Sequence, residues 1–305
     1  MELGFISATL KLSIPEILEW SAAQGFTCME ICTGPGEDDS DPSWKGHVNM
    51  RQVRAHGPDA IGKIFSASDL RIACLTSCWN FLDPDHAKRE AMRCDLLDTV
   101  DLAADLAIPV VTCFTGRDPS IDYDANLAAV VELFKHVCEK AEKRDVKIAI
   151  ENCPMPLRGF FGTPMNLAFN PPIWDAIFDG VGSARLGLTF DPAHLVFMQI
   201  DYVAALKEFG ERVFHFHAKD AELLPDVMKR TGTLVGRDYW QYRMVGHGAI
   251  DWAEYLKVLA STGYDGMLSI EHEDHAYGGT NEKKQEGILI AKAKLEEALA
   301  AAGLT

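Results

Sequence analysis

Residues 147–152, KIAIEN, are an apolar run that ends on a carboxylate, Glu151. Three later apolar runs also end on a side chain that can bind a metal ion: RLGLTFDPAH (185–194) on Asp191, VFHFH (213–217) on His217 and GMLSIEHED (266–274) on Glu271. Their composition is that of β-strands, and the polar residue stands where each strand should stop. The carboxyl ends of the strands in a parallel barrel converge on one mouth. We therefore expect the four side chains to surround one ion.

Strand-like and helix-like segments alternate along the chain, which favours a parallel sheet with crossover helices. Amphipathic patterns predict the helices, including a closing helix over residues 284–302. No Gly-rich GxGxxG turn follows the first strand, so a single (β/α)₈ TIM barrel of the α/β class fits better than a doubly wound sheet. We expect one domain over residues 1–305. The eight predicted strands are residues 3–7, 26–31, 70–76, 109–113, 146–151, 185–190, 212–217 and 266–271.

Two stretches interrupt this alternation. Residues 33–49 are polar and rich in turn formers, and they predict a loop after the second strand. Residues 218–250 predict a long insertion after the seventh strand. Loops of this length are usually lids, binding loops or interfaces. Both follow the C-terminal end of a strand, on the face where barrels place catalysis.

Composition narrows the class of protein. The chain has 305 residues, a net charge of −16 and a pI near 5.0, and an acidic surface repels nucleic acid. The N-terminal residues lack a basic, signal-like start, and no apolar run approaches the length of a membrane span. We expect a cytoplasmic protein without a membrane or nucleic-acid partner, and a homo-oligomer. Its eight cysteines show no CxxC spacing, so we expect reduced, mostly buried thiols.

The four predicted ligands form an oxygen-rich set of two glutamates, one aspartate and one histidine. Such a shell suits Mn²⁺, Mg²⁺ or Co²⁺ better than it suits a thiolate-type zinc site. We expect one divalent ion. Mn²⁺ is the preferred metal, and Mg²⁺, Co²⁺ and Zn²⁺ are alternatives. In FHFHAKD, alternation places His215 and His217 on one face of the strand, and His217 lies nearer its C-terminal end. His215 is therefore expected to be a hydrogen-bonded core residue. Glu271 is the expected last ligand, with Glu273 in reserve.

Each of these residues also has an ordinary structural interpretation. Glu151 could bond to a neighbouring loop or lysine, because a buried unpaired carboxylate is costly. Asp191 precedes Pro192, and Asp-Pro often starts a turn. His194, three residues later, could contact a ligand or cap a helix. The series of Glu, Asp, His and Glu on consecutive strands is stronger evidence than any one of them.

Further residues beside these strand ends could contact a substrate. Asn152 could bind a substrate hydroxyl or cap a turn, and Lys219 with Asp220 could contact the substrate or form an exposed ion pair. Trp79, after the third strand, and the two phenylalanines at 160–161 could form a stacking wall, or they could be ordinary packing residues.

The chain resembles the xylose isomerase-like barrel superfamily, in the branch of sugar phosphate isomerases and epimerases that includes ketose 3-epimerases and inosose dehydratases. The Asp-x-x-His turn at 191–194 and the 26-residue separation of Asp191 and His217 are specific to this group. The matching segments cover most of the chain from about residue 70 onward: LAIPVVTCFTGRDPS, KIAIENCP, FDPAHL, FHFHAKD, YRMVGHGAIDW and GYDGMLSIEHED.

The resemblance implies a divalent metal on the four strand-end ligands and a place near the substrate for His194. The free-ketose epimerases of this group carry an arginine shortly after the strand-seven histidine, whereas residues 218–224 contain none. This departure argues against a simple hexose 3-epimerase. The insertion could instead form a pocket for a larger or modified sugar, such as a glycoside. Its candidate contact residues are Arg230, Arg237, Tyr239, Trp240, Arg243 and His247.

The predicted function is a metal-dependent sugar isomerase or epimerase that removes a proton next to a sugar carbonyl through a metal-stabilised enediolate. Glu151 and Glu271 would act as acid and base on opposite faces of the sugar. One alternative is a lyase or dehydratase on a keto-sugar or 3-keto-glycoside, with His194 or His247 as the acid. More remote alternatives are an abasic-site endonuclease-like phosphodiesterase, whose additional ligands are missing from the first strand, and a barrel without catalytic activity.

Overall fold

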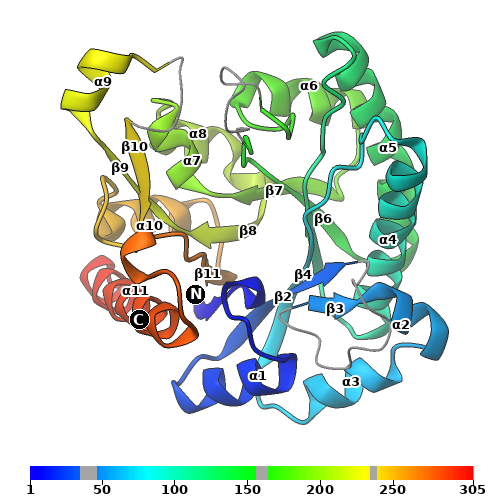
Figure 1. Ribbon diagram of the computed structural model, residues 1–305, viewed down its shortest axis with the longest axis horizontal. Helices are drawn as coiled ribbons and strands as arrows, with labels where there is room; N and C mark the ends of the chain where they lie inside the picture. Colours follow the sequence, from blue (N-terminus) through cyan, green and yellow to red (C-terminus); the bar gives the residue numbers. More distant parts are fainter. Residues whose placement is uncertain (35–46, 156–163, 234–238, 305) are drawn as a thin grey trace.

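The computed structural model describes residues 1–34, 47–155, 164–233 and 239–304, and its centre is a curled nine-stranded parallel sheet surrounded by helices (Figure 1). The strand order is β1-β11-β8-β7-β6-β5-β4-β2-β3. The first strand also meets the second, because Thr27 N donates to Leu3 O (3.3 Å) and Ile6 forms an isolated parallel bridge with Glu30. Eight strands thereby close into the predicted (β/α)₈ barrel, and β3 (His47–Asn49) extends the sheet beside β2.

All eight predicted barrel strands are confirmed, and each observed boundary lies within three residues of the predicted one. Glu271 lies one residue beyond its strand rather than inside it. The barrel strands are β1 (Glu2–Phe5), β2 (Cys28–Gly34), β4 (Arg71–Ser77), β5 (Val110–Cys113), β6 (Lys147–Glu151), β7 (Leu186–Phe190), β8 (Val213–Ala218) and β11 (Met267–Ile270).

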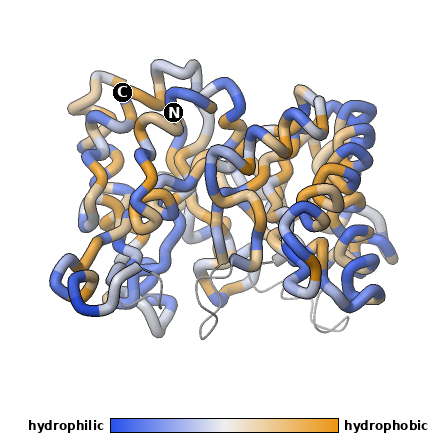
Figure 2. Tube along the Cα trace, turned by 90° about the horizontal axis from the view of Figure 1, so that it is seen from above, coloured by the Kyte–Doolittle hydropathy of each residue, from blue (hydrophilic) through white to orange (hydrophobic). Residues whose placement is uncertain are grey.

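The helices lie on the outside of the barrel, and hydrophilic stretches gather toward the outer edge of the helices on the right of Figure 2. The predicted closing helix is confirmed as α11 (Asn281–Ala302). The other helices are α1 (Ile14–Ala23), α2 (Met50–His56), α3 (Asp59–Ser66), α4 (His86–Asp105), α5 (Tyr123–Arg144), α6 (Pro171–Val181), α7 (Pro192–Phe197), α8 (Tyr202–Phe209), α9 (Pro225–Thr231) and α10 (Trp252–Ser261), with short 3₁₀ turns at Ser7–Thr9, Gly210–Arg212 and His275–Tyr277. Among the described residues, none of these helices is long and apolar enough to cross a membrane.

The two faces of the barrel strands carry different kinds of buried side chain. Outward-facing aromatic residues pack under the helices, as where Phe190 and Phe216 stack with ring centroids 6.4 Å apart. The interior carries hydroxyl groups, and Thr112 and Thr189 are hydrogen bonded there (2.9 Å). Barrel interiors are usually filled by branched aliphatic side chains. This barrel therefore differs from the usual pattern, because polar side chains lie in its interior beneath the strand-end residues.

The two predicted long loops are more structured than expected. The loop prediction for residues 33–49 is wrong at both ends, because β2 continues to Gly34 and residues 47–49 form β3; residues 35–46 lie outside the described part of the chain. The 218–250 segment contains β9 (Asp220–Leu223) and β10 (Trp240–Arg243), which pair antiparallel with α9 between them. Below, we call this pair the β9–β10 hairpin.

All eight cysteines are free thiols, as predicted. Six are buried, whereas Cys78 is partly exposed and Cys94 is exposed.

Gly4 allows β1 to approach β2 closely. A Cβ atom at this position would lie 2.2 Å from the Cys28 carbonyl oxygen and 2.5 Å from the Met267 Cε atom. We predict that Gly4→Ala lowers the free energy of unfolding by about 1–3 kcal/mol, because a backbone atom cannot move aside as a side chain can. Urea denaturation measures this change. Gly278→Ala is the control, since its Cβ would have an ordinary 3.4 Å contact, and its effect should stay below about 1 kcal/mol. Equal effects of the two variants would contradict the close-approach argument.

Candidate functional site

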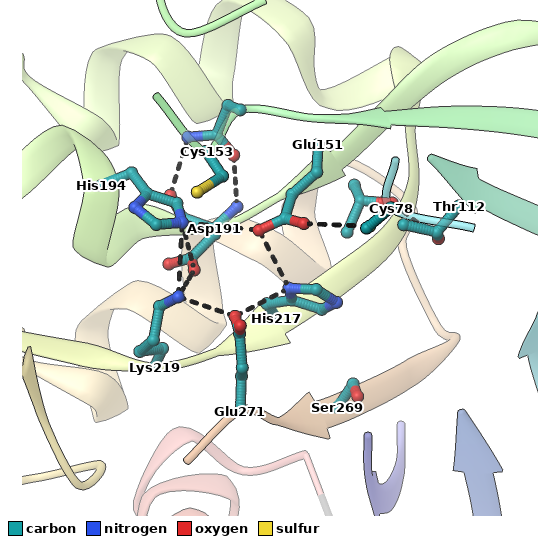
Figure 3. Close-up of polar contacts among 12 residues, drawn as sticks. Cys78, Thr112, Glu151, Cys153, Asp191, His194, His217, Lys219, Ser269 and Glu271 are labelled. Carbon is teal, nitrogen blue, oxygen red and sulfur yellow. Dashed lines mark hydrogen bonds and ion pairs between the residues drawn. The ribbon is translucent and has the colours of Figure 1, made fainter. Parts of the chain in front are cut away.

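The four predicted ligands lie at the C-terminal ends of neighbouring strands. Glu151 is the last residue of β6, Asp191 follows β7 directly, His217 lies in β8 and Glu271 follows β11. These strands are adjacent in the order β11-β8-β7-β6. Figure 3 shows the four side chains pointing toward one another. Parallel strand direction thus brings together residues that are up to 120 positions apart in the sequence.

The distances define one compact cluster. His217 Nδ1 lies 3.1 Å from Glu271 Oε2 and 3.5 Å from Glu151 Oε1. One ligand atom each of Glu151, Asp191, His194 and Glu271 lie within 4.8 Å of one another. Three of the predicted ligands are buried, and the side chain of Glu271 is 19% exposed. The cluster can therefore be reached from solvent beside Glu271.

Asp191 uses its two carboxylate oxygens differently. Oδ1 accepts a hydrogen bond from Ala193 N (2.8 Å) and caps α7, in which Pro192 takes the first position. Oδ2 faces the cluster, 2.9 Å from Lys219 Nζ and 3.1 Å from His194 Nε2. The turn interpretation and the ligand interpretation of Asp191 are therefore compatible.

Lys219 is a buried ammonium group within the cluster. It is 1% exposed, and Nζ donates to Glu271 Oε2 (2.7 Å) and Glu273 Oε2 (3.0 Å). Burial opposes the charged form, but Asp191 and Glu271 outweigh it and raise the pKa of Lys219 well above its usual value. The interpretation of Lys219 and Asp220 as an exposed ion pair is wrong, because both are buried.

Asp220 instead holds the segment that follows the β9–β10 hairpin. Its carboxylate accepts hydrogen bonds from the backbone N–H groups of Gly246 (3.1 Å) and Gly248 (3.2 Å) and from the Trp252 indole (3.0 Å). Gly248 is required by this approach, since a Cβ there would lie 2.2 Å from Asp220 Oδ1. Asp220, the residue after Lys219, thus fixes the return of the chain to α10.

His194 is fully buried, and its two ring nitrogens have different neighbours. Nε2 lies 3.1 Å from Asp191 Oδ2 and 3.4 Å from Glu151 Oε1, and Nδ1 is hydrogen bonded to the Tyr242 hydroxyl (2.9 Å). Burial opposes the imidazolium, but Asp191 and Cys153 outweigh it and raise the pKa of His194 to about 10. This raised pKa favours the imidazolium form of His194, and Nε2 is directed into the cluster, 3.3 Å from Lys219 Nζ.

The two glutamates of the cluster are ionised at neutral pH. Burial disfavours their charged forms, but His217 lowers the pKa of Glu151 below its usual value, and Lys219 and His217 do the same for Glu271. Asp191 differs, because its burial outweighs the neighbouring His194 and Lys219 and raises its pKa. Asp191 thus lacks full compensation of its negative charge.

A divalent cation fits this cluster. Asp191 Oδ2 and His217 Nδ1 are buried atoms that form no hydrogen bond of good geometry among the described residues. Their neighbours are charged groups, Lys219 Nζ at 2.9 Å from Asp191 Oδ2 and Glu271 Oε2 at 3.1 Å from His217 Nδ1. Carboxylate oxygens and an imidazole nitrogen are ligands of Mn²⁺, Mg²⁺, Co²⁺ and Zn²⁺. A cation would satisfy both atoms and the incompletely compensated charge of Asp191. Glu151, Asp191, His194 and Glu271 have ligand atoms close enough together to share an ion, and the predicted ligand His217 lies beside two of them through Nδ1.

Two residues that were predicted to contact the substrate, Asn152 and Trp79, form hydrogen bonds with backbone groups at the strand ends. Asn152 is buried, accepts from Asp191 N (2.7 Å) and donates to Asp191 O (2.9 Å), so it joins the ends of β6 and β7. Trp79 Nε1 donates to Thr33 O (3.3 Å), and its ring packs over Gly34 at the end of β2.

The remaining predicted contacts belong to the β9–β10 hairpin and the segment after it. Arg243 pairs with Glu222 (2.7 Å), His247 is exposed beside Tyr277, and Arg230 is exposed on α9. Trp240 stacks on Phe197 with ring centroids 3.8 Å apart. Tyr239 donates to the Phe197 carbonyl (3.0 Å), so this aromatic contact seats the hairpin on α7. Arg237, Phe160 and Phe161 lie outside the described residues.

Two residues of the site were not found from the sequence. Tyr242, on β10, is hydrogen bonded to His194. Glu30 lies in the middle of β2 and contacts both His215 (2.9 Å) and His217 (3.2 Å). The signal for Glu30 was present, because a charged residue inside the otherwise uncharged run CMEICT needs a buried partner. The prediction that His215 is a hydrogen-bonded core residue is confirmed.

The fold and the cluster together define a parallel barrel with a carboxylate and histidine centre at its C-terminal mouth. Residues 18–296 match the family described as "Xylose isomerase-like TIM barrel", and the chain belongs to this family. The match begins at residue 18, well before the matching segments that start at about residue 70.

Relatives and solved structures agree with this assignment. The chain is 25% identical to the uncharacterized protein YfiH of Bacillus subtilis, over 90% of this chain and 93% of YfiH. It is 33% identical to the inosose dehydratase of Clostridium beijerinckii, over 32% of this chain and 34% of that enzyme. Similar structures are the IolI protein with a bound zinc atom (TM-score 0.68, 20% identity, 99% of this chain and 98% of IolI) and a D-psicose 3-epimerase (TM-score 0.69, 17% identity, 99% and 100%). At these identities the structures establish the fold.

Lys219 neutralises part of the buried negative charge, which predicts a large effect of its loss. Lys219→Met should lower the free energy of unfolding by about 3–5 kcal/mol at neutral pH in the presence of a chelator, because it leaves Asp191 and Glu271 without their cation. Lys219 lowers the pKa of Glu271, so its contribution is present at neutral pH and is lost as the pH falls through that lowered pKa. The loss should therefore be smaller at about pH 3, which lies between the usual carboxylate pKa and the lowered pKa of Glu271.

Chemical denaturation at both pH values measures this difference. Lys257→Met is the matched control, since it removes an exposed lysine paired with Glu254 (2.6 Å), and it should cost below about 1 kcal/mol. If both lysine variants lose the same stability at every pH, Lys219 does not compensate the cluster.

Proposed function

We propose that this protein is a divalent-metal-dependent isomerase or epimerase of a small carbohydrate, acting by proton abstraction next to a carbonyl group. One observation supports this most: Glu151 and Glu271, from separate strands, extend toward one point from different sides (Figure 3). Two carboxylates placed in this way can exchange a proton with two faces of one carbon. The similarity to inosose dehydratases and the fold of the D-psicose 3-epimerase also favour a carbohydrate substrate.

Glu151, Asp191, His217 and Glu271 would hold the ion, and the oxygen-rich set favours Mn²⁺. The three carboxylates converge within 4.8 Å, and His217 Nδ1 lies 3.1 Å from Glu271 Oε2. When bound, the ion would supply positive charge beside the carbonyl oxygen and make the neighbouring C–H group more acidic. The ionised Glu151 or Glu271 then takes the proton from that carbon. Epimerisation needs a different proton on the other face of the same carbon, which Glu271 could take from Lys219 Nζ, 2.7 Å away, and pass on. Return of the abstracted proton to the adjacent carbon gives isomerisation.

The cationic groups of the cluster would orient and stabilise the substrate. Lys219 Nζ and His194 Nε2 both face the point between the glutamates, so they would donate hydrogen bonds to substrate oxygens on which negative charge develops. Asn152 would keep Asp191 in place through its two backbone hydrogen bonds. Trp79, Arg243 and His247 would contact the more distant part of a larger sugar.

A dehydratase of a keto-sugar or inosose is the second candidate, and His194 favours it. A pKa of about 10 keeps this buried imidazole protonated at neutral pH, 3.4 Å from Glu151. Glu151 would remove the proton next to the carbonyl, and His194 would protonate the hydroxyl that leaves as water. The 33% identity to an inosose dehydratase over 102 residues supports the same reaction.

Deuterium incorporation tests the shared first step. We predict that the enzyme with Mn²⁺, incubated in D₂O with keto-sugars, 3-keto-glucosides and inososes, incorporates deuterium next to the carbonyl of its substrate. Glu151→Gln and Glu271→Gln should reduce the rate by about 10²–10⁴-fold, because each removes a positioned base. Mass spectrometry and NMR after metal removal measure the exchange and distinguish an epimer from a dehydrated product.

Glu254→Gln, on the exposed face of α10, is the control and should keep the normal rate. Near-normal exchange by a metal-loaded Glu151→Gln variant would exclude Glu151 as the base.

Metal binding is tested by its effect on stability. We predict that Mn²⁺ at about 100 times its dissociation constant raises the free energy of unfolding by about 2.7 kcal/mol, and that a chelator removes the gain. Asp191→Asn should lose this gain, and its metal-free stability should fall less than that of Lys219→Met, because an asparagine Oδ1 can still cap α7 and Lys219 keeps Glu271 and Glu273. Thermal unfolding with and without Mn²⁺ measures both effects. An equal gain in the wild type and in Asp191→Asn would argue against Asp191 as a ligand.

A further inference from the structure

Glu30 is a buried carboxylate inside the barrel, on the opposite side of His217 from the candidate metal position. It is 0% exposed, and the register between β2 and β4 shifts between Met29 and Glu30. Four side chains from three other strands donate hydrogen bonds to its two oxygens: Thr76, Ser269 (2.5 Å), His215 (2.9 Å) and His217 (3.2 Å). Ser269 is visible below His217 in Figure 3. A carboxylate with this many donors is held in one orientation.

The contact with Glu30 decides which nitrogen of His217 faces the cluster. Nε2 lies 3.2 Å and 3.3 Å from the two Glu30 oxygens, so it donates its proton to this carboxylate. Nδ1 lies on the other side, 3.1 Å from Glu271 Oε2 and 3.5 Å from Glu151 Oε1, and it forms no well-aligned hydrogen bond within the described part of the chain. An ion that binds Nδ1 takes the place of any proton there, and the bound imidazole then carries its one remaining proton on Nε2. A proton fixed on Nε2 leaves the Nδ1 lone pair directed at the cluster.

Glu30, His215 and His217 also form a set of possible metal ligands on their own. Their contacts favour hydrogen bonding instead. His215 Nε2 is 2.9 Å from Glu30 Oε2, which is a direct N–H to carboxylate hydrogen bond. The hydroxyl groups of Thr76 and Ser269 occupy the remaining acceptor positions of the carboxylate. These side chains supply the hydrogen bonds that the buried Glu30 carboxylate requires, so no ion is needed to compensate it.

We propose that Glu30 is a positioning residue that fixes the tautomer and the ring orientation of His217, so that Nδ1 binds the divalent ion. This inference rests on the proposed function, in which His217 is a ligand. Hydrogen bonds from a ligand histidine to a carboxylate orient the ring and raise its basicity, and their loss typically weakens metal binding 10–100-fold. Glu30 would therefore control metal affinity without touching the metal or the substrate.

Glu30→Gln tests the role with almost no change of shape. The amide removes the negative charge and one of the two acceptor oxygens that face His217 Nε2, so the hydrogen bond that holds the proton on Nε2 becomes weaker. We expect Zn²⁺, used as a diamagnetic probe, to bind Glu30→Gln 10–100-fold more weakly than the wild type in titration calorimetry. Thr112→Val is the matched control, because it removes a buried hydroxyl of the same interior that bonds to Cys74 and Thr189. Thr112→Val should bind Zn²⁺ within about threefold of the wild-type affinity, a much smaller change than the 10–100-fold loss expected for Glu30→Gln.

A second measurement uses the wild type alone and does not depend on the folding of any variant. In zinc-loaded protein labelled with ¹⁵N-histidine, the His217 ring should show a protonated Nε2 and a metal-bound Nδ1, with the signal assigned by comparison with His217→Gln. The opposite pattern, or a Zn²⁺ affinity of Glu30→Gln equal to that of the wild type, would overturn the inference. Failure of the wild type to bind Zn²⁺ or Mn²⁺ would instead contradict the proposed function.

Discussion

The site depends on the concentration of buried negative charge at the barrel mouth. Glu151, Asp191 and Glu271 converge there because parallel strands end at the same edge, and burial makes each charge costly. Lys219 compensates part of this charge through contacts of 2.7 Å and 2.9 Å with Glu271 and Asp191. Asp191 remains undercompensated, as its raised pKa indicates. The same charge that is costly to the fold thus provides the attraction for a divalent ion.

Periodicity and strand ends were sufficient to predict the barrel and the quartet from the sequence. The eight strands were found because apolar runs stop at polar residues, and the quartet was found because those polar residues are all potential ligands. Glu30 escaped this rule because it lies within its strand, and its partners His215 and Ser269 are 185 and 239 residues away. Tyr242 was missed for a related reason, since the approach of the hairpin to α7 is a tertiary contact that no local pattern encodes.

The β9–β10 hairpin couples the outer part of the site to its chemistry. Trp240 stacks on Phe197 of α7, and Tyr242 reaches His194 on the same helix. Lys219 Nζ lies 4.5 Å above the Tyr242 ring, so one tyrosine contacts both cationic groups of the cluster. A change in the hairpin would therefore alter the positions of His194 and Lys219, even without a direct contact with the reacting carbon.

His217 connects two layers of the barrel, and this connection explains why its interior is polar. Toward solvent, Nδ1 meets Glu151 and Glu271, and toward the interior, Nε2 meets Glu30. A carboxylate beneath His217 needs donors of its own, because an unsatisfied buried charge would destabilise the fold. His215, Ser269 and Thr76 supply them, in positions where barrels usually place aliphatic residues. The polar interior is thus a consequence of orienting one histidine at the mouth.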